Sequence, residues 1–171
     1  MARTDPQLDV DEPTTLLQYL DYQRDTMLGK VEGLDQEQLG RRLPTSELTL
    51  AGLLKHLALV EDNWIQVRFL GRPESELEPW GDAPWDDDQD WEFHSALSEP
   101  PDELVSLYRA ACERSRQTVA GVDLASMSAG RNSDDKTWSL RWILVHLIEE
   151  TARHNGHADL LREAIDGQVG E

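Results

Sequence analysis

The sequence of 171 residues is poor in cysteine, in lysine and in long hydrophobic runs. Its single cysteine, Cys112, excludes an internal disulfide and a cysteine-rich zinc site. No apolar run approaches the roughly 20 residues that a membrane-spanning helix needs, and no apolar stretch follows Met1–Pro6 as in a signal peptide. We therefore expect one domain over residues 1–171, cytoplasmic and without a membrane partner.

Positive charge is also scarce. Sixteen Lys and Arg stand against 34 Asp and Glu, which gives a formal net charge of −18 and argues against nucleic acid as a partner. The segment 74–92 is acidic throughout, with no basic residue, and holds Trp80, Trp85 and Trp91. Because a disordered acidic tail seldom carries three tryptophans, two interpretations remain open. The segment is a surface loop whose aromatic side chains pack onto the rest of the protein, or a lid or wall over a pocket.

The hydrophobic pattern is helical throughout, without strand alternation or repeats. Apolar residues recur at helical spacing in four segments, which we expect to run from about 12 to 33, 49 to 71, 101 to 119 and 139 to 165. Residues 1–11 are expected to form a loose tail. The predicted fold is therefore all-α, a four-helix bundle with the long acidic loop between its second and third helices.

The last predicted helix carries a stripe of metal-binding side chains. His146, Glu150 and His154 are spaced by four, and His157 follows three residues later, so all four share nearly one face. A carboxylate and an imidazole on successive turns can chelate one ion. His56, on the second helix, would complete a site of two histidines and one carboxylate with open positions. The alternative is a hydrogen-bonded Glu150–His154 pair, with His56 as a hydrogen-bonded core residue.

Other polar residues near this stripe have simpler interpretations. Glu149 has Arg153 four residues later, which favours a surface ion pair over a role for Arg153 in holding a substrate carboxylate. His94 has no partner by spacing and is expected to be solvated. Cys112 lies on an apolar helix face and is expected to be a small core residue.

Two segments resemble a known family. The stretch VHLIEETARHNGHADLLRE, residues 145–163, resembles the closing helix of the DinB-like superfamily, and LLKHLALVE, residues 53–61, resembles its second helix. The similarity covers about residues 14–167, and the closest branch is the actinobacterial one that includes mycothiol-dependent enzymes. Members of the superfamily are four-helix bundles that bind a divalent metal, often zinc or nickel, and many use three histidines.

The resemblance implies a ligand set and a place for the other histidines. The ligands would be His56, Glu150 and His154, because the mycothiol-dependent branch similarly uses His, Glu and His. His146 matches a position that is often histidine and would lie behind the ligands or line the pocket. His157 stands where many relatives have glutamine, so its role stays open.

The resemblance also implies a function. It predicts an S-transferase that depends on a divalent metal, zinc or nickel, which activates the thiolate of a low-molecular-weight thiol such as mycothiol for attack on a small electrophile. A homodimer is expected because dimers are common in the superfamily. The alternatives are a non-catalytic metal-binding stress-response protein and an interaction protein that uses the acidic segment 74–92.

Overall fold

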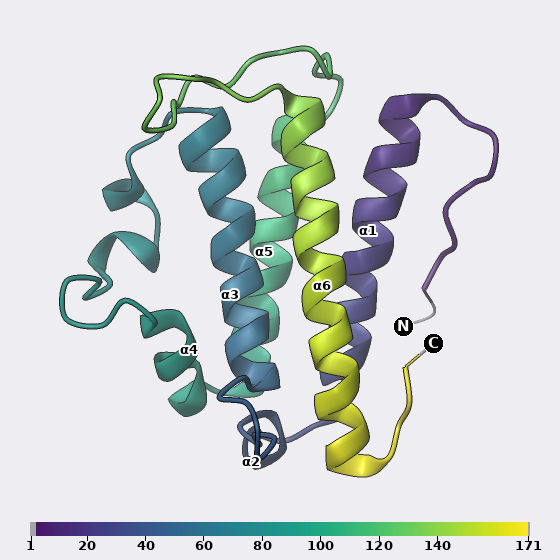
Figure 1. The fold of residues 1–171 in the computed structure, drawn as a ribbon, viewed down its shortest axis with the longest axis vertical. Coiled ribbons are helices and arrows are strands. Elements are labelled where there is room, and N and C mark those ends of the chain that lie inside the picture. The colour runs from purple at the N-terminus through teal and green to yellow at the C-terminus, as the bar shows by residue number, and fades with distance from the viewer. Residues whose placement is uncertain (1–2, 171) are drawn as a thin grey trace.

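The computed structural model describes residues 3–170, and its regular structure is helical (Figure 1). The long helices are α1 (Glu12–Val31), α3 (Leu50–Asp62), α5 (Pro101–Val119) and α6 (Leu140–Asp166). The shorter ones are α2 (Gln36–Leu39), the π-helical η1 (Asn63–Phe69), the 3₁₀ turns η2 (Glu74–Glu76), η3 (Trp80–Asp82) and η4 (Ala96–Ser98), and α4 (Trp91–Ser95). The described residues contain no strand, only an isolated bridge between Met127 and Ser139.

The four long helices form a bundle, which confirms the predicted fold class. α1 packs mainly against α6 and α3 against α5, while α3 also contacts α6. Figure 1 shows α3 and α6 side by side, α5 behind them, and the two ends of the chain on the same side of the molecule. The face that joins α3 and α6 therefore brings together the two helices that carry the predicted ligands.

Capping side chains set the ends of these helices close to the predicted positions. Asp11, Thr49 and Ser139 each accept a hydrogen bond from a backbone N–H in the first turn of α1, α3 and α6. Gly167 ends α6 in the left-handed region, with φ of 79°. The second predicted helix differs from a regular α-helix, because its last turns form the π-helical segment η1.

The acidic segment 74–92 packs against the bundle through its aromatic side chains. Trp80 is fully buried, and its Nε1 donates to Asp62 Oδ2 at 2.9 Å. Arg114 binds the same carboxylate, with Nη2 2.7 Å from Oδ2. Trp85 Nε1 donates to the backbone oxygen of Trp80 at 3.0 Å. The tryptophans thus pack onto the bundle, as the first of the two interpretations expects, and the segment is held in one place beside α3.

The described part of the N-terminal tail, residues 3–11, is irregular but contacts α1. Arg3 Nη1 donates to Thr26 Oγ1 at 3.0 Å, and Gln18 accepts from the backbone N–H of Gln7 at 2.7 Å. These two contacts join this part of the tail to α1, and residues 1 and 2 lie outside the described residues.

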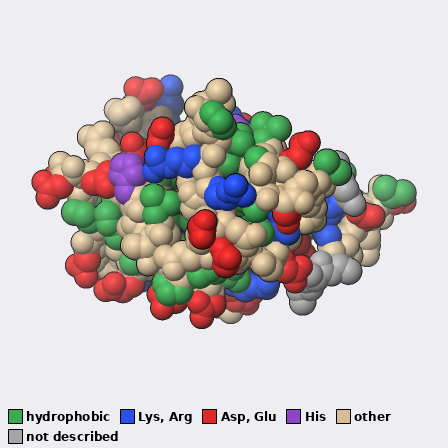
Figure 2. All heavy atoms as spheres, turned by 90° about the horizontal axis from the view of Figure 1, so that it is seen from below, with side chains coloured by type: hydrophobic (Ala, Val, Ile, Leu, Met, Phe, Trp, Pro, Cys, Tyr) green, Lys and Arg blue, Asp and Glu red, His purple; other side chains and the backbone are tan. Residues whose placement is uncertain are grey.

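The surface carries the acidic excess of the composition. Figure 2, a view from below onto the α2 end of the bundle, shows acidic side chains around the rim of this face and hydrophobic side chains between them. Among the described helices, none combines the length and apolar character needed to cross a lipid bilayer.

Candidate metal centre

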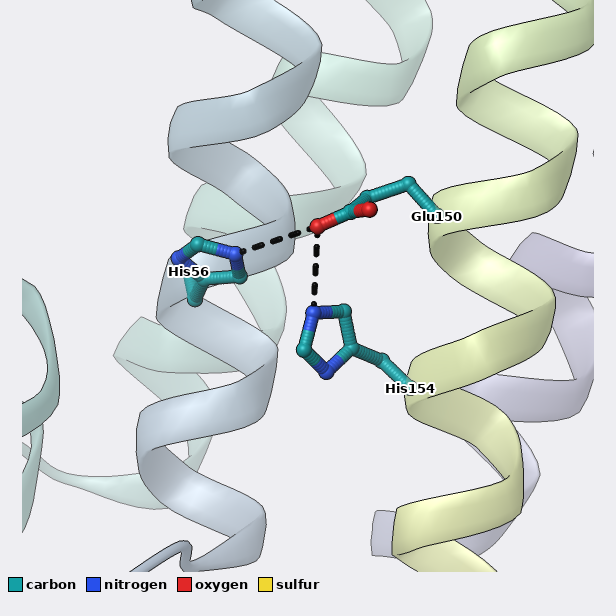
Figure 3. A group of neighbouring side chains, drawn as sticks. All are labelled: His56, Glu150 and His154. Carbon is teal, nitrogen blue, oxygen red and sulfur yellow. Dashed lines mark hydrogen bonds and ion pairs between the residues drawn. The ribbon is translucent and has the colours of Figure 1, made fainter.

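The structure brings His56, Glu150 and His154 together between α3 and α6 (Figure 3). One ligand atom from each of the three lies within 4.8 Å of the others. Glu150 Oε1 is 3.7 Å from His56 Nε2 and 3.2 Å from His154 Nε2. The side chains of His56, Glu150 and His154 are 20, 17 and 11 % exposed, so solvent reaches a centre that is otherwise enclosed.

His56 is held in a fixed orientation by α4. Its Nδ1 lies 3.0 Å from Glu92 Oε1, and its ring stacks on Phe93 with centroids 4.9 Å apart. A carboxylate can only accept, so Nδ1 carries the proton and donates to Glu92. The lone pair of His56 Nε2 then faces Glu150. A carboxylate or carbonyl that holds the far nitrogen of a histidine in this way is the usual support of a metal-ligating imidazole.

The protonation states of the other two side chains also suit ligands. Burial and the neighbouring His56 lower the pKa of His154 below its usual value, although Glu150 acts in the opposite direction. Burial raises the pKa of the Glu150 carboxyl, but His154 and His56 more than offset this, so the pKa is lower than usual. A neutral imidazole and an ionised carboxylate are the forms that bind metal ions.

The donor set and its geometry fit a divalent cation. His56 Nε2 and Glu150 Oε1 are both acceptors when Nδ1 of His56 carries the proton, and two acceptors that face each other at 3.7 Å can share one cation as ligands. Ligand atoms in a tetrahedral site with bonds near 2.1 Å lie about 3.4 Å apart. The two printed spacings, 3.7 and 3.2 Å, are close to this value, so two imidazole nitrogens and a carboxylate oxygen could supply three corners of such a site and leave the fourth open.

Comparison with protein families identifies the family of the chain. The family model described as mycothiol-S-transferase matches residues 15–167, which includes α3, α6 and all three candidate ligands. The chain belongs to the mycothiol S-transferase family. Comparison with curated proteins finds no match.

The remaining histidines of the stripe in this mycothiol S-transferase family member lie on either side of the centre. His157 Nδ1 is 3.4 Å from His154 Nδ1, on the side of the ring away from Glu150. His146 lies one turn before Glu150, where its ring stacks on Trp142 and contacts Trp64 at centroid distances of 5.3 and 4.5 Å. His157 thus supports a candidate ligand, whereas His146 belongs to an aromatic cluster beside the centre.

The charged residues next to the stripe form the ion pair expected from their spacing. Arg153 Nη2 binds Glu149, and its Nη1 is 4.0 Å from Glu150 Oε2. His94 is exposed, as expected, but it has a partner. Its Nδ1 lies 2.9 Å from Asp88 Oδ2, and this hydrogen bond raises the pKa of His94. Helical spacing does not predict the His94–Asp88 contact, because a bend in the acidic segment brings the two side chains together.

Sequence analysis also missed Glu92. It is one of the nine acidic residues of segment 74–92, and nothing in their spacing singles it out. In the structure it is the buried one, 5 % exposed, and its Oε2 has no hydrogen-bond partner among the described protein atoms. Only the docking of α4 on α3 gives this carboxylate its place behind His56.

Proposed function

We propose that this member of the mycothiol S-transferase family is a divalent-metal-dependent enzyme that joins a low-molecular-weight thiol such as mycothiol to a small electrophile. The observation that carries the proposal is the convergence of His56, Glu150 and His154, which each bring one ligand atom within 4.8 Å of the others. The family match over residues 15–167 supports the thiol as the substrate.

The proposed cofactor is zinc, with nickel as the second candidate, because both accept imidazole nitrogen together with carboxylate oxygen. When bound, the cation supplies Lewis acidity, which favours the thiolate form of the thiol substrate at neutral pH. The thiolate is the reactive nucleophile in sulfur chemistry.

The protein side chains have distinct tasks in this proposal. Glu92 fixes the tautomer of His56 through the contact at 3.0 Å, and Phe93 fixes the plane of its ring. Glu150 supplies the negative charge that offsets part of the charge of the cation. His154 offers a neutral nitrogen because burial lowers its pKa.

Metal analysis of purified wild type, His154→Ala and His94→Ala tests the proposal. His94→Ala is the matched control, because His94 is exposed and lies outside the candidate centre. We expect about one equivalent of zinc or nickel in wild type and in the control, and its loss in His154→Ala. The control is needed because a net charge of −18 attracts cations nonspecifically.

The same three proteins are then assayed for transfer of mycothiol to a nitroaromatic halide. An equal metal content in all three proteins would refute the assignment of His56, Glu150 and His154 as the metal ligands. Loss of the metal with full transfer retained would refute metal dependence. Metal binding without transfer, tested over several electrophiles, would favour the non-catalytic metal-binding alternative.

A further inference from the structure

We propose that an aromatic surface beside the metal centre binds the electrophile, and that this electrophile is an aromatic or apolar molecule without negative charge. The surface consists of Trp64, Trp138, Trp142 and His146 and is called here the aromatic shelf. The proposal rests on the proposed function in one respect, because the shelf matters for transfer only if the thiol reacts at the neighbouring centre.

The shelf is a continuous set of ring contacts between η1, α6 and the segment before α6. Trp64 lies 5.3 Å from both Trp138 and Trp142 and 4.5 Å from His146, measured between ring centroids. Trp142 and His146 stack nearly parallel, with an angle of 12°. Although its ring contacts those of Trp64, Trp138 and His146, Trp142 is 47 % exposed. An aromatic face that remains open to solvent in this way is a surface on which another planar ring can stack.

The shelf adjoins the candidate metal centre. Trp142, His146 and Glu150 follow one another at intervals of four on α6, which corresponds to a rise of about 6 Å per step. The π-helical segment η1 begins at Asn63, and Trp64 from this segment contacts His146 across the two helices. Single π-helical turns within helices are frequent at functional sites. An electrophile stacked on Trp142 and His146 would therefore lie between one and two helical turns, about 6 to 12 Å along the helix axis, from Glu150 at the centre.

A groove that Trp64 also lines lies next to the shelf. It has a volume of about 260 Å³ and lies between α3 and the acidic segment, lined by Leu59, Val60, Asn63, Trp64, Glu74 and Trp85. Its walls are mainly apolar, with one amide and one carboxylate. Glu74 and Trp85 of the acidic segment thus form one wall of this groove.

The charge beside the shelf includes one guanidinium, that of Arg68, 6.0 Å from the centroid of the Trp138 ring, but the acidic groups around the shelf disfavour anionic electrophiles. Glu149 Oε2 is 3.9 Å from His146 Nδ1, and Glu74 lines the groove beside Trp64. The segment 74–92 has nine acidic and no basic residues within a chain of net charge −18. A substrate with a carboxylate would meet this negative potential, whereas a neutral ring would not.

Binding can be tested without any reaction by two ligands that lack a leaving group. The pair is 1,3-dinitrobenzene and 3,5-dinitrobenzoate, which differ only in a carboxylate. Equilibrium dialysis of the metal-loaded protein measures both. We expect the neutral ring to bind at least about tenfold more tightly than the anion. We also expect Trp142→Ala to weaken it by about tenfold, the upper range for a lost aromatic pair. Leu160→Ala is the matched control, because Leu160 is also exposed on α6 but lies beyond the centre.

Transfer is then measured with 1-chloro-2,4-dinitrobenzene and mycothiol. In this reaction a bond forms between sulfur and the ring carbon, the carbon–chlorine bond breaks, chloride leaves with the bonding pair, and the thiol proton passes to solvent. We expect kcat/KM of Trp142→Ala to fall about tenfold while its metal content stays that of wild type. Equal binding of the two ligands, or unchanged binding in Trp142→Ala, would overturn the proposal.

Two further outcomes separate this inference from the proposed function. If His154→Ala loses metal and transfer but still binds 1,3-dinitrobenzene, the centre and the shelf are separate parts, as proposed. If wild type transfers mycothiol but Trp142→Ala neither loses ligand binding nor changes kcat/KM, the function stands and the shelf is refuted. A change of sedimentation from dimer to monomer in Trp142→Ala, with binding unchanged, would identify the shelf as a contact between two copies of the chain.

Discussion

The burial and the neighbours of a side chain set its protonation state and reactivity, and the single cysteine is an example. Cys112 is 2 % exposed on α5 and lies near the buried Glu61 carboxylate. Burial, reinforced by this charge, raises the pKa of Cys112 to about 12. At neutral pH the residue is therefore a protonated, inert thiol, and the nucleophilic sulfur of the proposed reaction comes from the substrate.

The reactivity of Cys112 with a disulfide reagent at pH 8 should be low in the folded protein. We expect the reaction to be on the order of a thousandfold slower than in the unfolded chain, because the thiolate fraction falls tenfold for each unit of pKa. Because this is the only cysteine, release of the reagent chromophore reports on it alone. Equal rates with and without denaturant would show that the thiol is accessible and ionised.

A second prediction at the residue scale concerns the buried ion pair between α1 and α3. Arg24 binds Glu61 through two hydrogen bonds of 2.6 and 2.7 Å, and both side chains are 2–3 % exposed. Glu61→Gln leaves a buried guanidinium without its full counter-charge. We expect a loss of about 3–5 kcal/mol in the free energy of unfolding, measured by urea denaturation.

The exposed pair Arg141–Glu12 is the control for that variant. Because solvent screens it, Arg141→Met should change the free energy of unfolding by less than about 1 kcal/mol. The double variant Arg24→Met/Glu61→Leu should recover most of the loss, since it removes both buried charges. A small effect of Glu61→Gln would mean that Asp21, 2.8 Å from Arg24, suffices as the partner.

At the scale of elements, the short helix α4 acts as a support for the candidate metal centre. Lys55 from α3 binds Ser95 and Glu99 and lies 3.9 Å from the ring of Trp91, which fixes α4 against α3. Phe93 fits closely over Gly52 of α3, where a Cβ would lie 2.8 Å from its Cδ1. The absence of a side chain at position 52 thus lets α4 approach and places Glu92 at His56.

Gly52→Ala should therefore weaken metal binding without altering a ligand. We expect the methyl group to displace Phe93 and α4 and to loosen the Glu92–His56 contact, which should raise the Kd for zinc by about 10- to 100-fold. Overpacking of this contact should also cost about 1–3 kcal/mol of stability. Competition with a zinc chelator measures the affinity, and urea denaturation measures the stability.

Gly29→Ala is the matched control, because a Cβ at position 29 of α1 would meet nothing within 4 Å. It should leave the zinc affinity unchanged and stabilise the helix by about 0.5–1 kcal/mol. Unchanged zinc affinity in Gly52→Ala would show that the position of α4 does not govern His56.

At the scale of the whole molecule, the excess of negative charge is the dominant electrostatic property. The formal net charge is −18, and the excess acidic side chains repel one another more strongly in the compact state than in the expanded unfolded chain. Many of the ion pairs, such as Arg141–Glu12 and Arg42–Glu47, are exposed and contribute little to stability. Salt screens both the repulsion between acidic side chains and the attraction within the exposed ion pairs. Because the repulsion is the larger of the two, salt should stabilise the folded protein.

The melting temperature should consequently rise by a few degrees when sodium chloride increases from about 10 mM to about 500 mM. Calorimetry with the chelated, metal-free protein excludes effects on metal binding. A fall in melting temperature over this range would show that the attractive ion pairs outweigh the general repulsion.

The sequence was sufficient to predict the long helices and the stripe of metal-binding side chains on the last of them. Hydrophobic spacing is a local signal, and it predicted the long helices to within a few residues, with Thr49 and Ser139 observed as the caps at two of the expected starts. The spacing of Glu150 and His154 places both on one face of any helix, and the observed Glu150–His154 contact at 3.2 Å follows from that geometry. The resemblance of residues 53–61 and 145–163 to the DinB-like superfamily pointed to His56 as the partner on α3.

The tertiary structure alone decided what surrounds that stripe. Glu92 reaches His56 from 36 residues along the chain, and no local pattern distinguishes it from its acidic neighbours. The aromatic shelf likewise joins Trp64 of η1 to Trp142 and His146 of α6, which only the packing of α3 against α6 brings together. Local spacing fixes which side chains share a helix face, whereas contacts between distant segments depend on how the faces pack, and so they first appear in the folded molecule.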